Sequence, residues 1–525
     1  MDIIENEKKK RTILYGLLVT VLVLIGVTYA YYRITKTQTN SNVIGTRTCL
    51  NTTLTEETSE IVLSDAFPIS DEDGLKQSPF TFTLTNNCDS YVKVTIALVS
   101  EYRTSTSTSY LKDNYVKSNL STKGTNDGSS VILSTLSLGE VDTNTQGYVL
   151  KTTGLKNKEA KSFDLRLWLD SETTNEQGLN KTWKGKIVVS VVAAEYVPTF
   201  AETILANNEV KAPITTPGAA ISTADEAEFA STEDDYGTSY YFRGAVTNNY
   251  VEFANKCWRI VRVGGDGSVK LILHNDNTAG VANPCDSANN SASAAFARYS
   301  GTTYKSAFNT NYNDNAYVGF KYGTVGAGDY ALTHANTNKS TILTNLETWY
   351  TNNLKDYADA IADTVWCNDK TNVTDTTYDP YGWNPNGLGY AKNVTYYGAT
   401  QRLVGTSGSA GGTGPSLKCN GELSKINSKV GLITADELAL AGYAAGTGNT
   451  TTYLQENATD TYWWSLSPDY FVGGYAGVWG VNGSSGFFGR YSVGGTYGVR
   501  PSISLKSTTN ITGEGTSSTP YIISM

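Results

Sequence analysis

Histidine, the side chain that most often performs acid–base catalysis, is scarce in this chain. Only His274 and His334 occur among 525 residues, so histidine-based triads and multi-histidine metal sites have little to draw on. His274 ends an apolar run, which favours a structural role. We therefore expect that the protein is not an enzyme and that it needs no cofactor.

Cysteine is the other chemically active residue type, and its spacing favours structural disulfides. The six cysteines are Cys49, Cys88, Cys257, Cys285, Cys367 and Cys419. None lies in a CxxC pair, so zinc is not expected. Several pairings are open, but the division into domains favours Cys49–Cys88, Cys257–Cys285 and Cys367–Cys419. Disulfides form in oxidising compartments, which favours an extracellular protein.

Acidic residues in two places invite a functional interpretation. In the stretch DTTYDPYGWNPNG, Asp375, Asp379, Asn384 and Asn386 could offer oxygen ligands to calcium, although their spacing matches no EF-hand. Asx turns explain the same composition, so we expect no metal.

Asp436 and Glu437 open an apolar helical pattern, where negative charge complements the helix dipole. A buried pair between one of them and Arg500 is expected.

The segment 469–497 has the composition of a recognition surface. It holds nine glycines, four tyrosines, three phenylalanines and three serines, and no Lys, Glu, Gln, Met or Pro. Tyrosine gives a large contact area at low entropy cost, while glycine and serine adapt the backbone. The residues predicted to contact ligand are Tyr470, Tyr475, Trp479, Asn482, Phe487, Phe488, Arg490, Tyr491 and Tyr497. The alternative is a glycine-rich meander whose aromatics fill a core.

The framework of this segment follows from its valines and from the residues before it. Val472, Val478, Val481 and Val493 are expected to point inward, and core anchoring is expected for at least one of Trp463 and Trp464.

The N-terminus predicts membrane insertion. Residues 12–32 form an uncharged run that, as a helix, would measure about 32 Å against a hydrocarbon core of about 30 Å. Lys8, Lys9, Lys10 and Arg11 precede it, so residues 1–11 are expected in the cytoplasm and the rest outside. A cleaved signal peptide is the competing interpretation, and would give a secreted protein.

Composition bounds the remaining architecture and the partners. The length suggests two or three domains. The chain has 41 basic and 50 acidic residues, a net charge of −9, which argues against nucleic acid as a partner.

Residues 47–195 alternate apolar and polar side chains, as in Phe80–Leu84, Tyr91–Leu98 and Phe163–Leu169, and predict an all-β sandwich. The Pro- and Ala-rich residues 196–235 are expected to be a linker.

Residues 236–525 are expected to form an α+β domain. Strands are predicted around Tyr240–Phe242, Tyr250–Phe253 and Cys257–Val263, followed by a tight GGDG turn. Helical spacing marks residues 341–352 and 435–443, the second opened by Thr434 as an N-cap with Glu437 three residues on. The expected fold is thus a transmembrane helix, a β-sandwich and an α+β domain.

Motifs in fixed order give the last domain a resemblance. GTSYYFRG, CWRIVRVGGDGSVKLIL, LETWYTNNLKDYADAIADTVWCND, GLITADELALAGY, WWSLSP and GVRPSISLK together resemble an exported bacterial C-type-lectin-like module related to the formylglycine-generating-enzyme fold. The resemblance implies that the terminal strands meet, with residues 520–523 near the Tyr240 strand. It does not carry over the enzyme's activity, because no cysteine pair lies close together near the C-terminal motifs. FTLTN, FDLRLWLD and WKGKIVVSVVA in residues 47–195 resemble camelysin-like sandwiches.

Some modules of this type are variable proteins of diversity-generating retroelements. In those proteins randomised AAY codons cannot encode Lys, Glu, Gln, Met or Trp, so Trp479 would be a fixed position in segment 469–497. An undiversified binder is the other interpretation. Either way the expected function is extracellular binding of a glycan, peptide or protein ligand. The alternative is a structural subunit of an extracellular fibre or biofilm matrix.

Overall fold

The computed structural model describes residues 34–37, 52–56, 61–63, 66–140, 146–178, 180–219, 221, 226–385, 390, 393–507 and 511–523. The chain divides into two compact units, residues 1–197 and 198–525. Each unit has its own hydrophobic core.

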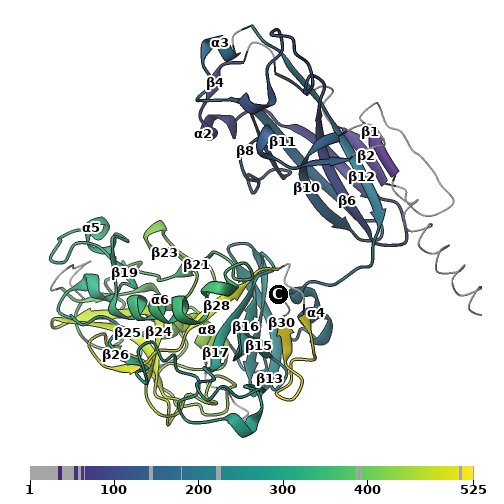
Figure 1. Cartoon of the computed structure of the whole chain (residues 1–525). Helices are drawn as coiled ribbons and strands as arrows, with labels where there is room; N and C mark the ends of the chain where they lie inside the picture. The colour runs from purple at the N-terminus through teal and green to yellow at the C-terminus, as the bar shows by residue number, and fades with distance from the viewer. Residues whose placement is uncertain are drawn as a thin grey trace, which may run out of the picture. The chain divides into compact units, whose positions relative to one another are not determined.

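Unit 1 is a β-sandwich, as the alternating pattern predicts (Figure 1). One sheet has the order β1-β12-β6-β10-β9 with β3 on β12, and the other has the order β2-β5-β11-β7-β8 with β4 on β11. Its strands are β1 (Ile34–Thr37), β2 (Thr52–Glu56), β3 (Ile61–Leu63), β4 (Pro68–Ile69), β5 (Phe80–Asn86), β6 (Val92–Ser100), β7 (Val116–Thr122), β8 (Val131–Ile132), β9 (Leu138–Glu140), β10 (Gln146–Leu155), β11 (Ala160–Asp170) and β12 (Trp183–Ala193). The helices α2 (Asp71–Gly74) and α3 (Asn175–Gly178) are single turns.

The core of unit 1 lies between its two sheets. Phe82 and Phe163 from one sheet, and Ile96 and Val189 from the other, belong to one buried cluster. These residues occupy alternate strand positions, so each strand places one apolar face against the core.

Unit 2 contains two large sheets and short helices. The first sheet has the order β13-β14-β16-β15-β30-β29, with β17 between β16 and β28, and the second has the order β18-β27-β24-β25-β26 with β22 on β24. The strands of the first sheet are β13 (Ala227–Asp234), β14 (Gly237–Gly244), β15 (Tyr250–Phe253), β16 (Lys256–Val263), β17 (Val269–Asn275), β28 (Ser502–Leu505), β29 (Ile511–Thr512) and β30 (Tyr521–Ile523). Those of the second are β18 (Lys305–Ser306), β22 (Thr395–Tyr396), β24 (Trp463–Val472), β25 (Tyr475–Val481), β26 (Phe488–Ser492) and β27 (Tyr497–Gly498).

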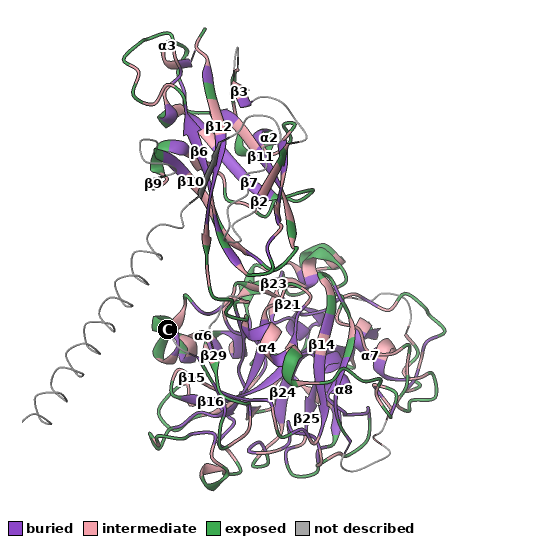
Figure 2. Ribbon diagram, turned by 90° about the vertical axis from the view of Figure 1, so that its right-hand side faces the viewer, coloured by how far each residue is buried: buried purple, intermediate pink, exposed green. Residues whose placement is uncertain are grey.

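The described part of unit 2 also has two small ribbons and five α-helices. They are β19 (Lys321–Tyr322) with β20 (Asn338–Lys339), β21 (Thr364–Cys367) with β23 (Lys425–Ser428), α4 (Phe200–Asn207), α5 (Tyr330–His334), α6 (Thr341–Asn353), α7 (Gly398–Leu403) and α8 (Ala435–Leu440). The predicted helices are confirmed as α6 and α8, and Thr434 with Glu437 forms the predicted capping box. Much of β24 and β25 is buried (Figure 2).

Three expectations about the architecture are corrected. The fold is mostly β-sheet, with 38% strand against 15% helix, so an α+β description of the last domain overstates its short helices. Among the described residues no helix is long and apolar enough to cross a membrane, so the expected anchor and membrane localisation find no support there. The segment predicted to form that anchor, residues 12–32, lies outside the described residues.

The predicted linker is the third correction. Residues 198–235 belong to unit 2, where they form α4 and β13. Phe200 and Ile204 of α4 are fully buried in the core of unit 2, because the capping box of Thr199 and Glu202 starts an amphipathic helix there.

Disulfides close two loops of unit 2 as predicted. Cys257 pairs with Cys285, and Cys367 pairs with Cys419. Cys88 of unit 1 is also disulfide-bonded, while Cys49 lies outside the described residues. Such bonds fit an extracellular or otherwise oxidising location.

Candidate functional site

Several glycines of segment 469–497 pack directly against aromatic rings, and we call them seat glycines. A Cβ atom at Gly494 would lie 2.8 Å from the ring of Tyr312, and one at Gly495 would lie 2.7 Å from that of Tyr497. Gly480 meets Tyr491 and Gly489 meets Phe487 in the same way, at 3.1 and 2.6 Å. Only glycine leaves room for a ring to lie this close to the backbone. The glycine and tyrosine content of the segment therefore reflects ring–backbone packing.

These rings form two partly exposed groups on the second sheet of unit 2, Tyr312 with Tyr475 and Tyr462 with Tyr491 and Tyr497. With the exposed Phe487 we call them the tyrosine surface, which thus comprises Tyr312, Tyr462, Tyr475, Phe487, Tyr491 and Tyr497. Tyr462 stacks on Tyr497 with ring centroids 5.1 Å apart, and Tyr491 meets Tyr462 edge-on at 5.0 Å. Offset and edge-on contacts of this kind fix ring positions without covering the outer faces.

The most exposed part of the tyrosine surface is a stacked pair at the hairpin between β24 and β25. Tyr312 and Tyr475 lie 5.3 Å apart with an interplanar angle of 3°, and their exposures are 42% and 52%. Gly473 and Gly474 both have positive φ, as a two-residue hairpin turn requires. The turn places Tyr475 opposite Val472 at the end of the hairpin.

The structure divides the predicted ligand-contacting residues into four groups. Tyr475, Phe487, Tyr491 and Tyr497 belong to the tyrosine surface, while Tyr470 and Arg490 contact a separate aromatic cluster. Asn482 folds its turn, because its Oδ1 accepts hydrogen bonds from the backbone and side chain of Ser484.

The remaining two predictions of ligand contact, Trp479 and Phe488, are corrected. These side chains are 1% and 0% exposed and pack against each other in the core. Of the predicted inward valines, Val478, Val481 and Val493 are fully buried and Val472 is half-buried. Trp463 and Trp464 are both buried, as expected for core anchors.

The second aromatic cluster surrounds Arg490 and is built mainly by the loop before β22. The Arg490 guanidinium carbon lies 3.4 Å from the centroid of Tyr381 and 5.5 Å from that of Trp383. Trp383 also meets Tyr396 at 5.7 Å and Tyr470 at 5.0 Å. The sequence gives no local sign of this cluster, because its members come from distant segments.

Asp469 is the buried acid of this region. Burial raises its pKa to about 6, while the hydrogen bond from Thr400 and the charge of Arg490 act in the opposite direction. One carboxylate oxygen accepts from the Thr400 hydroxyl, and the other has no hydrogen-bond partner. A buried carboxyl with one unsatisfied oxygen favours its protonated form.

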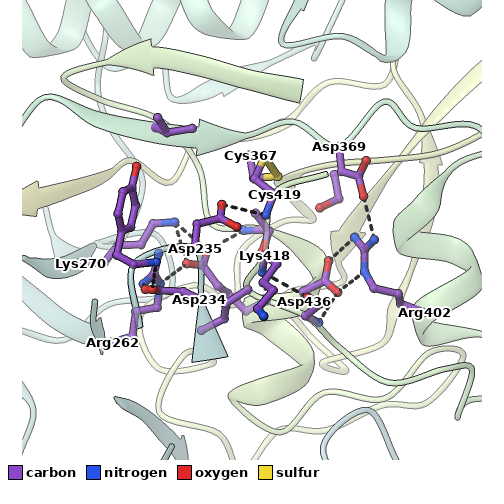
Figure 3. Close-up of a pocket in the computed structure, with 17 residues that line it drawn as sticks. Asp234, Asp235, Arg262, Lys270, Cys367, Asp369, Arg402, Lys418, Cys419 and Asp436 are labelled. Atoms are coloured by element: carbon purple, nitrogen blue, oxygen red, sulfur yellow. Dashed lines mark hydrogen bonds and ion pairs between the residues drawn. A yellow bond between two sulfur atoms is a disulfide. The ribbon is translucent and has the colours of Figure 1, made fainter. Parts of the chain in front are cut away.

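Ion-paired side chains line a charged pocket of unit 2 (Figure 3). Lys270 and Arg262 both contact the Glu437 carboxylate, at 2.7 and 3.0 Å. Arg402 joins Asp369 and Asp436, at 2.7 Å each. These groups neutralise one another, so the pocket presents paired charges to its surroundings.

The paired charges correct the prediction that Asp436 or Glu437 binds Arg500. The guanidinium of Arg500 instead donates to the carbonyl oxygens of Leu273 and Leu454 and lies over the Trp463 ring. Glu437 faces two other cations because α8 turns it toward β16 and β17. Burial opposes ionisation of Glu437, but Lys270 and Arg262 lower its pKa to about 2.

The histidines and the candidate calcium ligands have local partners or neighbours. Burial lowers the pKa of His274, whose Nε2 lies 3.1 Å from Asn457. Asp375 accepts from Thr377, and Asp379 accepts from the backbone amides of Trp383 and Asn384. The Asp375 contact is an Asx turn of the kind that the composition suggests, whereas Asp379 accepts from amides four and five residues on. Asn386 lies outside the described residues.

Two members of the tyrosine surface, Tyr312 and Tyr462, fall outside the segment singled out by composition. The backbone of Tyr312 accepts from the Ala476 amide, and that of Tyr462 accepts from the Gly498 amide. These pairings set the positions of both rings, and no local sequence signal reveals them. No protein-family model matches the chain, and no curated protein or solved structure matches it significantly.

Proposed function

We propose that unit 2 is a recognition module that binds a carbohydrate on its tyrosine surface. The observation that carries the proposal is the close packing of tyrosine rings, which stay partly exposed, against glycine backbone. Tyr312 and Tyr475 are the most exposed of these tyrosines. Exposed aromatic faces of this kind are typical of binding surfaces.

The chemistry of the surface favours a flat, polar ligand. Small-molecule sites are usually deep and apolar, whereas the tyrosine surface offers ring faces with hydroxyl groups at their edges. A sugar ring has an apolar face of C–H groups and a rim of hydroxyls, so it can stack on tyrosine and exchange hydrogen bonds with it. The motif order that resembles C-type-lectin-like modules also supports a binding role.

The glycine seats favour a dedicated surface over a diversified one. Replacement of Gly494 or Gly495 by any other residue would drive a Cβ atom into the ring of Tyr312 or Tyr497. Random variation at these positions would therefore disturb the surface it is meant to vary. Sequencing of the codons for residues 469–497 across a cell population tests this, and we expect them to be invariant. Variation at the seat glycines would contradict a dedicated surface.

Binding is tested with the triple variant Tyr312→Ala, Tyr475→Ala and Tyr491→Ala on an array of neutral and acidic glycans. Loss of hot-spot aromatics of this kind costs about 2 kcal/mol or more each, so we expect at least a tenfold fall in affinity. Tyr236→Ala is the matched control, because Tyr236 is 62% exposed but lies outside the surface.

Thermal unfolding separates a binding defect from a folding defect. We expect the triple variant to unfold at a temperature close to that of the Tyr236→Ala control. Wild-type affinity in a folded triple variant would refute the proposal. Assembly of the wild-type chain into filaments under the electron microscope would favour the structural alternative.

A further inference from the structure

Arg490 differs from every other arginine of unit 2 in how its guanidinium is used. Arg243, Arg259, Arg262, Arg298, Arg402 and Arg500 all donate hydrogen bonds to carbonyl or carboxylate oxygens. Arg490 donates none to the described residues, and it forms no ion pair with them. Its side chain is nevertheless only partly buried. The group is thus charged, reachable and without a hydrogen-bond acceptor in the part of the chain that the structure describes.

Stacking holds this guanidinium in place. Its carbon lies 3.4 Å from the centroid of Tyr381, a cation–π contact that constrains the plane of the group while leaving its N–H edge open. Arginine loses side-chain freedom when a ligand fixes it, so a side chain that is already fixed binds at lower cost.

The ring wall behind Arg490 is itself rigid. The Asp379 carboxylate accepts from the Trp383 amide at 2.9 Å and from the Tyr396 hydroxyl at 2.9 Å. Tyr470 closes the other side, and its ring lies over Gly477, where a Cβ atom would be 2.4 Å away. These contacts position the wall without involving the N–H groups of Arg490.

No carboxylate among the described residues lies within ion-pair distance of Arg490. Asp469 feels its charge but is buried and bound to Thr400, and burial raises the pKa of this acid. A planar guanidinium with open N–H groups matches one partner best, a planar carboxylate that accepts two parallel hydrogen bonds.

We propose that Arg490 is the binding residue for the carboxylate of an acidic sugar, so that the ligand of unit 2 is a uronate-containing glycan. The inference rests on the proposed carbohydrate-binding function. Arg490 of β26 pairs with Trp479 of β25, and Tyr475 lies four positions before Trp479 in β25, so Arg490 and Tyr475 are on the same face of the sheet. A glycan on this face can contact Arg490 and the Tyr475 part of the tyrosine surface together.

The test uses a trigalacturonate and its methyl ester, which share rings and linkages but differ in charge. Titration calorimetry on the full chain should show that the wild type prefers the acid by about tenfold or more, the range of a charge-assisted hydrogen-bond pair. Arg490→Gln should abolish that preference while leaving the affinity for the ester unchanged. Arg490→Lys should retain part of it, because lysine keeps the charge but lacks the planar fork.

Lys418→Gln is the matched control. It removes the same charge from an exposed position of unit 2, so it reports any general electrostatic effect of charge loss. We expect it to bind both ligands like the wild type. Thermal unfolding of Arg490→Gln establishes that the variant is folded.

The outcomes separate this inference from the proposed function. If Arg490→Gln keeps the preference for the acid, or if the wild type has none while binding neutral glycans, the uronate assignment is overturned and the proposed function stands. If the wild type binds only an acidic peptide such as acetyl-Glu-Glu-amide, both are overturned. Loss of both ligands in the tyrosine variants, with loss of only the acid preference in Arg490→Gln, supports both.

Discussion

The ring of Tyr312 lies directly over the backbone of Gly494, 182 positions later in the chain. A Cβ atom added to Gly494 would stand 2.8 Å from Cδ1 of Tyr312, closer than side chains pack. The same ring stacks on Tyr475 at 5.3 Å. Gly494 therefore determines how close to the backbone the stacked rings of Tyr312 and Tyr475, the most exposed pair of the tyrosine surface, can lie.

Gly494→Ala should lift Tyr312 and weaken glycan binding more than it weakens the fold. Overpacking typically costs about 1–3 kcal/mol of unfolding free energy. We expect the loss to stay within this range, because the ring of Tyr312 is at the surface and can move. Gly328→Ala is the control, because a Cβ atom there meets nothing within 4 Å. Chemical unfolding and calorimetry measure the two effects. Equal behaviour of the two variants would show that Gly494 is not a seat.

Glu437→Gln should be strongly destabilising. The change leaves Lys270 and Arg262 without their shared carboxylate, and uncompensated buried charge costs about 3–5 kcal/mol. The control is Glu347→Gln, whose partner Lys339 is 53% exposed, and we expect less than about 1 kcal/mol there. Urea unfolding gives both values. Similar losses of unfolding free energy in the two variants would show that the buried ion pairs of Glu437 contribute no more to stability than the exposed pair of Glu347.

The stabilising contribution of the Lys270–Glu437 pair should be lost in acid. Its neighbouring cations lower the pKa of Glu437 to about 2 against burial, so the folded chain binds fewer protons here than the unfolded chain. This contribution is present above the ordinary pKa of Glu, and it disappears as the pH falls toward 2. Unfolding measured from pH 5 to pH 2 should show the loss, and Glu437→Gln should show less of it.

His334 should make unit 2 less stable at mildly acidic pH. Burial and the charge of Lys370 lower its pKa to about 3, and neither ring nitrogen has a hydrogen-bond partner. The unfolded chain takes up the proton near the ordinary pKa of 6.5, so stability falls as the pH drops from there toward 3. At pH 5 the cost is about 2 kcal/mol.

His334→Phe removes this titration and keeps a ring among the neighbouring Tyr330 and Tyr390. The gain in stability over the wild type should therefore be larger at pH 5 than at pH 8, as urea unfolding at the two values will show. A constant difference would mean that His334 takes up its proton at the same pH in the folded and the unfolded chain.

The stability gained by Asp469→Asn should change with pH in the opposite direction to that gained by His334→Phe. Burial raises the pKa of Asp469 to about 6, so the wild type loses stability as the pH rises from 3.8 through 6. The advantage of the uncharged variant should grow by about 2 kcal/mol between pH 4 and pH 7. Parallel unfolding curves of the two proteins across this range would contradict the shift. Asp375→Asn, at an exposed position, provides the control.

The period of apolar residues was enough to predict the local elements. Alternation along Phe163–Leu169 predicted β11, because a half-buried strand must place every second side chain inward. The spacing of Ile342, Leu346 and Trp349 predicted α6 in the same way, and all three are buried. Cysteine spacing within unit 2 predicted both of its disulfides.

Pairing across the sheets was beyond the reach of these patterns. The terminal strand β30 joins β15 in a parallel pair, in the sheet that also contains the Tyr240 strand but not beside that strand. The charge partners of Glu437 and Arg500 were also wrong in prediction. A carboxylate in a sequence pairs with whichever cation the fold brings within a few ångströms, and sequence distance says nothing about this.

The sequence by itself determined that segment 469–497 would carry an unusual density of aromatic rings and glycines. Only the tertiary structure decided which of these rings face outward. Trp479 and Phe488 are buried, whereas Phe487 beside Phe488 is 40% exposed, because pairing of β25 with β26 points Trp479 and Phe488 into the core. Tyr312 and Tyr381 come from distant loops and complete the tyrosine surface and the Arg490 cluster. Composition is a property of one segment, whereas a binding surface is formed by contacts between segments, so only the folded chain specifies it.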